Sequence, residues 1–125
     1  MSDRIEVRKT YKLYIGGAFP RSESGRTYEV VDSDGAFLAN AALASRKDGR
    51  DAVLAARKGW ASWSAATAYN RGQVMYRIAE VMEGRRAQFV SDVRAAEGVD
   101  EWSAADIVDA LVDRWVWYAG WTDKL

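Results

Sequence analysis

Helical periodicity dominates this chain from residue 45 onward. Apolar side chains recur there at steps of three and four, first at Val53, Ala56, Trp60 and Trp63. Residues spaced in this way share one side of an α-helix, whereas strand residues alternate with a period of two. The same spacing recurs in three later segments, at residues 74–82, 89–96 and 107–118. We therefore predict about four helices within residues 45–120.

Polar residues predict where these helices begin. Ser45 and Asp48 have the spacing of a capping box, with aspartate in place of the usual glutamate. A second helix is expected to begin within residues 67–71. The fourth is expected to begin near Ser103, because an acidic residue, Asp106, again stands three positions later.

Glycines predict where the helices end. Gly84 is expected to weaken or break the second helix, since glycine is a poor helix former. Gly98 stands where a left-handed glycine would end the third, and Gly120 fits the end of the fourth.

The first third of the chain predicts strands. Residues 11–15 alternate with period two, residues 28–31 form a second extended run, and residues 37–44 a third with many alanines. Turn-forming clusters at residues 22–25 and 32–35 separate them. We predict an α+β fold, with a charged tail at 1–10, a β-hairpin or strands within 11–44, and helices within 45–120.

Composition excludes several functional classes. With 49% hydrophobic residues, the chain is not expected to be disordered. Its 18 basic and 18 acidic residues give zero net charge, which argues against a nucleic-acid partner. No apolar run approaches the roughly 18–20 residues that cross a bilayer, so no membrane partner is expected. Residues 1–9 are charged and lack the apolar core of a secretory signal, so we expect a cytoplasmic location.

Residues able to act as nucleophiles are limited, because the chain contains no cysteine and no histidine. Lys47 or Lys58 could form a Schiff base if desolvated, but both lie in charged helical surroundings and are expected to be solvated. Gly16-Gly17 lacks the later glycine of a dinucleotide-binding loop and predicts a turn. We assign no catalytic, cofactor-binding or metal-ligating residue.

The tryptophans predict packing and an interface. Trp60 and Trp63 lie on an aliphatic stripe, which favours core packing. Trp117 and Trp121 lie four residues apart, on a different side of the fourth helix from Trp115. A helix that is aromatic on two sides is usually covered on two sides. Leaving two tryptophans uncovered forgoes up to roughly 8–12 kcal/mol of burial free energy. We therefore predict that Trp117 and Trp121 form an interface.

Five segments together resemble the N-terminal region of the NAD(P)-dependent aldehyde dehydrogenases in order and spacing. They are Leu13–Phe19, Ser24–Val31, Asp48–Trp63, Asn70–Glu80 and Trp117–Leu125. The last includes Tyr118-Ala119-Gly120-Trp121, which is similar to a tyrosine-alanine-glycine-tryptophan segment of the family. In one departure, residues 32–35 replace the family's asparagine-proline turn, and we expect this turn to be looser.

The resemblance implies a supporting role. In the family this region supplies a strand pair and helices that pack beside a Rossmann-like coenzyme domain, near the subunit interface. The parent reaction converts an aldehyde to a carboxylic acid. A cysteine thiolate attacks the aldehyde, hydride passes to NAD or NADP, and water releases the acid. The cysteine, the glutamate base, the oxyanion asparagine and the coenzyme-contacting residues all lie on later segments. The resemblance therefore implies that this chain alone binds no coenzyme and is inactive.

Two functions remain open. The chain is either the N-terminal fragment of such an oxidoreductase, from a truncated or split gene, or a free-standing, non-catalytic interaction or oligomerisation module derived from the family. Its expected partner is the remainder of a dehydrogenase chain or another copy of itself. Nothing in the residues recommends a third possibility, an unrelated small enzyme.

Overall fold

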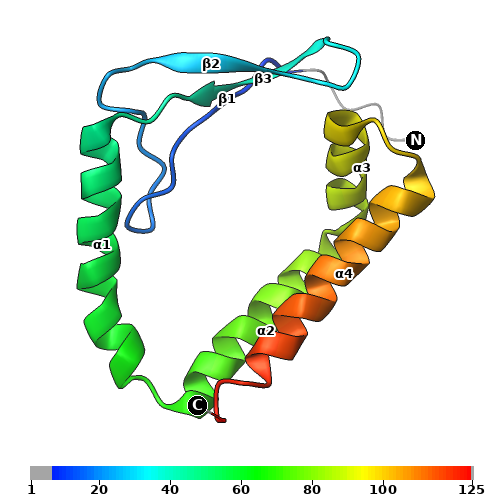
Figure 1. Ribbon diagram of the computed structural model, residues 1–125. Coiled ribbons are helices and arrows are strands. Elements are labelled where there is room, and N and C mark those ends of the chain that lie inside the picture. Colours follow the sequence, from blue (N-terminus) through cyan, green and yellow to red (C-terminus); the bar gives the residue numbers. More distant parts are fainter. Residues whose placement is uncertain (1–6, 125) are drawn as a thin grey trace. The chain divides into compact units, whose positions relative to one another are not determined.

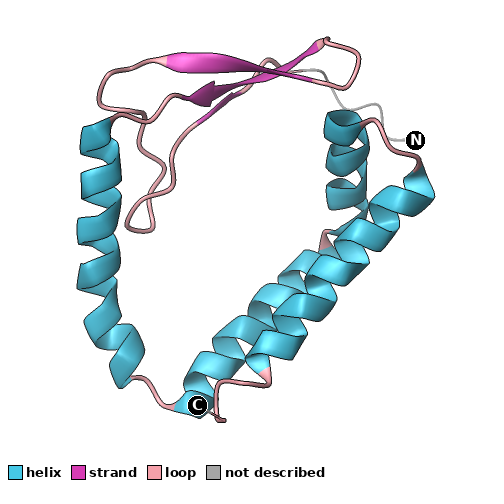
Figure 2. Cartoon of the chain, in the orientation of Figure 1, coloured by secondary structure: helices cyan, strands magenta, loops and turns pink. Residues whose placement is uncertain are grey.

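The computed structural model describes residues 7–124. The chain divides into two compact units, residues 1–59 and 60–125. The strands and the first helix up to Gly59 belong to the first unit. The end of that helix and three further helices belong to the second. Figures 1 and 2 show these strands and helices. The order of strands followed by four helices confirms the predicted α+β fold.

A three-stranded sheet with the order β1-β3-β2 forms the first unit's framework. β2 and β3 pair antiparallel and make the predicted hairpin, whereas β1 runs parallel to β3. The strands are β1 (Thr10–Tyr11), β2 (Thr27–Val31) and β3 (Phe37–Ala42).

The first strand is shorter than predicted, so the expectation of a strand over residues 11–15 is wrong beyond Tyr11. Gly16 and Gly17 both adopt positive φ, at 62° and 81°, and turn the chain back on itself. The amide nitrogens of Ile15 and Ala18 each donate to the other's carbonyl oxygen, at 3.0 and 3.1 Å. The alternating pattern therefore continues into a tight local turn rather than into the sheet.

The hairpin turn at residues 32–35 is held by its own aspartate. Asp32 Oδ1 accepts hydrogen bonds from the backbone nitrogens of Asp34 and Ala36, at 2.9 and 2.8 Å. The Asp32 nitrogen also donates to the Ala36 carbonyl at 2.8 Å. These bonds supply a local constraint where the family's turn carries a proline.

Helix α1 (Arg46–Ala65) begins at the predicted capping box. The Ser45 nitrogen donates to Asp48 Oδ2 at 2.8 Å, and the Asp48 nitrogen donates to Ser45 Oγ at 3.2 Å. These reciprocal bonds satisfy two amide groups that have no partner inside the helix.

The prediction that Trp60 and Trp63 pack in a core is wrong for the described residues. Their exposed fractions are 66% and 40%, and Val53 on the same stripe is 55% exposed. The apolar stripe of α1 is therefore left open rather than buried.

Helices α2 and α3 are separated where the glycine predicted a break. α2 (Ala68–Gly84) begins after Thr67, whose Oγ1 accepts a hydrogen bond from the Asn70 nitrogen at 3.1 Å. Arg85 then leaves helical geometry, with φ of −111°, before α3 (Arg86–Glu97) begins.

Helix α4 (Glu101–Ala119) begins before the predicted position. Gly98 ends α3 in the left-handed conformation, as predicted, with φ of 66°. The cap of α4 is Asp100 rather than Ser103. Asp100 Oδ1 accepts from the Ser103 nitrogen at 3.0 Å, and Oδ2 accepts from the Ser103 hydroxyl at 2.7 Å. Ser103 thus lies inside the first turn as the donor, which is why the prediction was wrong.

The second unit has a small core between α3 and α4. Its buried residues are Val90, Ala104 and Val108, and Phe89, Val93, Val99 and Ala105 pack against them. Arg86 on α3 also forms a two-pronged ion pair with Asp109 on α4, with N–O distances of 2.6 and 2.8 Å. This hydrogen bonding lowers the pKa of Asp109. Packing and charge together hold α3 against α4.

Candidate interface on helices α2 and α4

Helices α2 and α4 lie side by side because small residues meet between them (Figure 1). Gly72 of α2 is buried, and Ala119 at the end of α4 is only 2% exposed. A Cβ added to Gly72 would lie 2.8 Å from Thr122 Oγ1 and 3.6 Å from the Ala119 carbonyl oxygen. Sequence reasoning missed Gly72, although a glycine within a helical pattern often has a packing reason.

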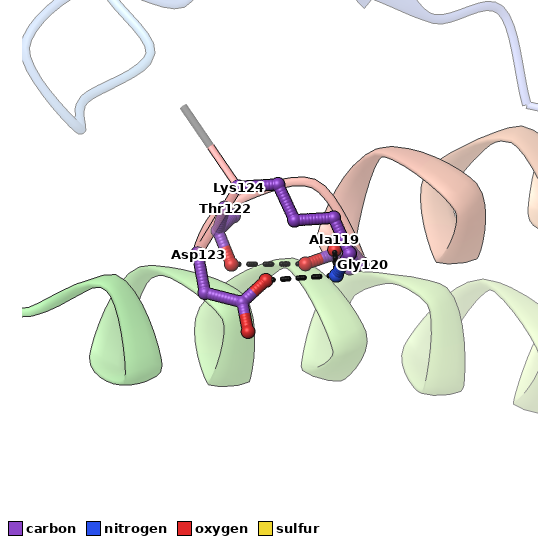
Figure 3. Close-up of polar contacts among 5 residues, drawn as sticks. All are labelled: Ala119, Gly120, Thr122, Asp123 and Lys124. Atoms are coloured by element: carbon purple, nitrogen blue, oxygen red, sulfur yellow. Dashed lines mark hydrogen bonds and ion pairs between the residues drawn. The ribbon is translucent and has the colours of Figure 1, made fainter.

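The chain after α4 folds back in a hydrogen-bonded turn, which Figure 3 shows in close-up. The Thr122 hydroxyl donates to the Ala119 carbonyl at 2.9 Å. Lys124 Nζ donates to the Gly120 carbonyl and pairs with Asp123 Oδ1 at 2.9 Å. The bond from Lys124 lowers the pKa of Asp123. Gly120 follows the last residue of α4, as predicted, but in the right-handed conformation, with φ of −66°.

This turn and α2 together line a hollow of about 300 Å³. Tyr69, Gln73 and Tyr76 contribute the α2 side, and Asp123 and Lys124 contribute from the turn. The three α2 residues could not be predicted as neighbours of the turn from the sequence, because only the packing of α2 against α4 brings them there.

Trp117, Tyr118 and Trp121 form an exposed aromatic cluster, here called the aromatic face. The Trp117 and Trp121 rings lie 5.4 Å apart, and the Trp117 and Tyr118 rings meet edge-on at 5.0 Å. Their exposed fractions are 57%, 53% and 39% for Trp117, Tyr118 and Trp121. Both residues of the predicted interface thus lie in one contiguous cluster.

An apolar hollow of about 340 Å³ adjoins this face through Tyr118 and Arg114. The hollow is also lined by Met75 of α2 and by Leu111 and Trp115 of α4. Leu111, Trp115 and Tyr118 are spaced four and three residues apart, so they lie on one side of α4. Aromatic and aliphatic side chains with few charges are typical of the centre of a protein interface.

Three of the four described helix starts are capped by side chains of this chain, and α3 starts at Arg85 without a side-chain cap. The start of α1 is capped by Ser45 and Asp48, that of α2 by Thr67, and that of α4 by Asp100. Gly16-Gly17 lies in a turn that no helix follows. Neither the three capped helix starts nor the Gly16-Gly17 turn therefore has the strand, glycine-rich turn and helix of a dinucleotide-binding loop.

The lysines of α1 and the acidic residues at the start of α4 have structural or solvated surroundings. Lys47 and Lys58 are exposed on α1. Asp100 caps α4, and Glu101 pairs with Arg94 at 3.5 Å. Within residues 7–124 no three acidic, histidine or cysteine side chains gather as metal ligands. Over the same range, no helix combines the length and apolar character needed to span a bilayer.

Comparisons with known proteins agree on the family. The sequence matches the aldehyde dehydrogenase family over residues 19–125. Human cytosolic 10-formyltetrahydrofolate dehydrogenase is 30% identical over 123 residues, which cover 95% of this chain and 14% of that enzyme. D-glyceraldehyde dehydrogenase (NADP(+)) from Thermoplasma acidophilum is 30% identical over 115 residues, covering 91% of this chain and 23% of that enzyme.

A solved structure shares the fold. NAD-dependent aldehyde dehydrogenase from Sinorhizobium meliloti superposes with a TM-score of 0.89 at 24% identity, over 95% of this chain and 24% of that one. The chain therefore spans a small part of the length of the proteins that it matches. Over that part, sequence and fold agree, and the chain belongs to the aldehyde dehydrogenase family.

Proposed function

We propose that residues 11–125 form a supporting layer, the N-terminal part of an NAD(P)-dependent aldehyde dehydrogenase whose parent reaction converts an aldehyde to a carboxylic acid. On this proposal the reactive thiol and the coenzyme site lie on polypeptide outside these residues. The chain by itself binds neither NAD nor NADP, has no dehydrogenase activity, and acts in the cytoplasm together with its partner.

The observation that carries the proposal is the exposed aromatic face on a segment of this family. Trp117 and Trp121 expose 57% and 39% of their surface, although buried tryptophan stabilises a fold by several kcal/mol. The exposed apolar stripe of α1, on which Trp60 is 66% exposed, also supports the proposal. Contiguous exposed apolar surface of this kind marks contact with another polypeptide.

On this proposal the layer provides a surface for contact with its partner and contributes no catalytic residue. The close contact of Gly72 with the turn at Thr122 fixes the end of α4, and thereby the position of Trp121. The ion pair between Arg86 and Asp109 fixes the other half of α4 against α3. A rigid α4 holds the aromatic face in one arrangement for its partner.

An enzymatic assay tests the absence of activity. The full chain is incubated with NAD+ or NADP+ and a panel of aldehydes, and reduced coenzyme is followed by absorbance at its nicotinamide band. We expect no protein-dependent signal. Reduced coenzyme that scales with the amount of purified chain would overturn the proposal.

The second candidate is the free-standing module, which the small core of α3 and α4 favours because it gives the second unit packing of its own. An immunoblot of source cells, with an antibody against this chain, separates the two. A band at the size of a whole dehydrogenase, or co-purification with a dehydrogenase subunit, supports the supporting layer. A band near 13.9 kDa, without a larger band and without co-purification of a dehydrogenase subunit, supports the module.

A further inference from the structure

A hollow on the first unit gathers three cationic side chains from separate positions in the sequence. Lys12 follows β1, while Arg21 and Arg26 stand at the two ends of the loop that leads into β2. The hollow has a volume of about 170 Å³, and Thr10 and Thr27 also line it. No carboxylate is among its lining side chains.

The three cations have no ion-pair partner within residues 7–124. The ion pairs of that range use Arg50, Arg77, Arg86, Arg94 and Lys124. The loop itself contains Glu23, which forms none of the ion pairs above and does not line the hollow. The carboxylate that hydrogen-bonds to the loop is Asp48, whose oxygens accept from Ser22 Oγ at 2.6 Å, the Ser45 nitrogen at 2.8 Å and the Glu23 nitrogen at 3.1 Å. These bonds, that of Ser22 foremost, lower the pKa of Asp48, and no cation contributes. The positive charges around the hollow are therefore not neutralised by Asp48.

The loop that carries the two arginines is fixed in place. Asp48 holds Ser22, and the Gly25 nitrogen donates to the Ser22 carbonyl at 2.9 Å. Gly25 has φ of 68°, which suits glycine in this turn. The Leu43 nitrogen donates to the Arg26 carbonyl at 2.9 Å, so the far end of the loop is tied to the sheet. The hollow is thus formed before any ligand arrives, which reduces the entropy lost on binding.

We propose that this hollow binds a phosphate group, either free or carried on a small metabolite. Arginine guanidinium groups pair with phosphate oxygens through two parallel hydrogen bonds, and lysine adds a point charge. The 170 Å³ of space is well above the roughly 10–15 Å³ that one bound water needs, so the hollow has room for a group larger than water. The inference is independent of the proposed supporting function.

A nuclear magnetic resonance titration of the full chain tests the site. Inorganic phosphate and, separately, glycerol 3-phosphate are added at constant ionic strength, with sodium chloride as the replaced salt. We expect saturable shifts of backbone amides within residues 10–12 and 21–27. Saturation with inorganic phosphate supports a site for the free ion, and saturation with glycerol 3-phosphate alone supports a site for a metabolite.

Paired variants identify the residues responsible. Arg21→Gln with Arg26→Gln is expected to weaken the apparent affinity by roughly tenfold or more, because two charge-assisted contacts are lost. Lys12→Gln is expected to weaken it less. The matched control is Arg57→Gln with Lys58→Gln, which removes the same charge from exposed positions in the same unit and is expected to leave binding unchanged.

Three results would overturn the site. The first is that the apparent affinity falls equally in the test and control pairs. The second is that the amide shifts stay linear with phosphate concentration and occur near cations throughout the chain. The third is that chloride produces the same amide shifts as phosphate. Each of these would show that the charges act without a specific site. Dispersed amide spectra of every variant establish that folding is retained.

Discussion

A Cβ on Gly72 would lie 2.8 Å from Thr122 Oγ1, so the backbone of α2 and the turn after α4 approach as closely as a glycine allows. The Thr122 hydroxyl is held there by its hydrogen bond to the Ala119 carbonyl. This contact joins the start of α2 to the end of α4, beside the aromatic face.

We predict that Gly72→Ala destabilises the chain in spite of the better helix propensity of alanine. Overpacking costs roughly 1–3 kcal/mol, against a gain of about 1 kcal/mol from replacing glycine within a helix. The free energy of unfolding, measured in urea, is therefore expected to fall by up to about 2 kcal/mol.

The matched double variant decides whether Thr122 is the cause. Combined with Thr122→Ala, the substitution Gly72→Ala is expected to stabilise by roughly 0.5–1 kcal/mol relative to Thr122→Ala alone, because the clash is gone. An equal effect of Gly72→Ala in both backgrounds would contradict the contact.

Stability is predicted to decrease in acid through Asp48. Hydrogen bonds from Ser22, Ser45 and Glu23 lower the pKa of Asp48 from its ordinary 3.8 to about 2. The unfolded chain therefore takes up this proton at a higher pH than the folded chain does. The stabilisation is present above pH 3.8 and is lost as the pH falls toward 2.

Urea unfolding measures this loss of stability when it is carried out at pH 6 and again at a pH approaching 2. The difference in unfolding free energy between the unmodified chain and Asp48→Asn should be smaller in acid. Asp51→Asn, which removes a half-exposed carboxylate from the same helix, is the control for charge. A difference for Asp48→Asn that does not change with pH would count against the assignment.

Asp100, rather than Ser103, is predicted to be the residue on which the start of α4 depends. Asp100→Ala removes the acceptor for both Ser103 hydrogen bonds, while Asp100→Asn keeps a good capping side chain. Thermal unfolding followed by circular dichroism should rank the melting temperatures as Asp100→Ala lowest and Asp100→Asn close to the unmodified chain. A larger fall in melting temperature from Asp106→Ala than from Asp100→Ala would instead favour a helix start at Ser103 that depends on Asp106.

The α3–α4 core is predicted to respond to truncation of Val108, which is 1% exposed. Val108→Ala removes two methyl groups and leaves a cavity, at an expected cost of about 2–3 kcal/mol in unfolding free energy. Val116 on the same helix is 42% exposed, and its alanine variant is expected to change stability little. Equal losses in the two variants would show that the core lies elsewhere.

The aromatic face is predicted to mediate association. Trp117→Ser with Trp121→Ser removes the ring pair and should shift the chain toward monomer in size-exclusion chromatography with light scattering. The control is Tyr14→Ser with Phe19→Ser, which removes another exposed ring pair, 5.1 Å apart, from the first unit. An unmodified chain that is fully monomeric, and unchanged in the tryptophan variant, would contradict the interface.

The sequence by itself determined the local structure, because caps and glycine ends act over three or four residues. The Ser45–Asp48 box, the break at Gly84 and the left-handed Gly98 are all where the pattern placed them. The strand over residues 11–15 and the cap at Ser103 failed where two signals competed. Residues 13–20 hydrogen-bond to one another across the left-handed Gly16 and Gly17 instead of extending the sheet, and Asp100 caps α4 ahead of Ser103.

Only the tertiary structure decided which apolar faces are covered. A helical stripe predicts that something packs on it, but not whether the partner lies within the chain. Small side chains of α3 and α4 form the core, whereas Trp60 and Trp63 of α1 remain exposed. The approach of Gly72 to Thr122 and the gathering of Arg21 and Arg26 around one hollow likewise depend on contacts between distant segments. Periodicity records the side of an element on which a residue lies, and burial depends on what the rest of the polypeptide brings to that side.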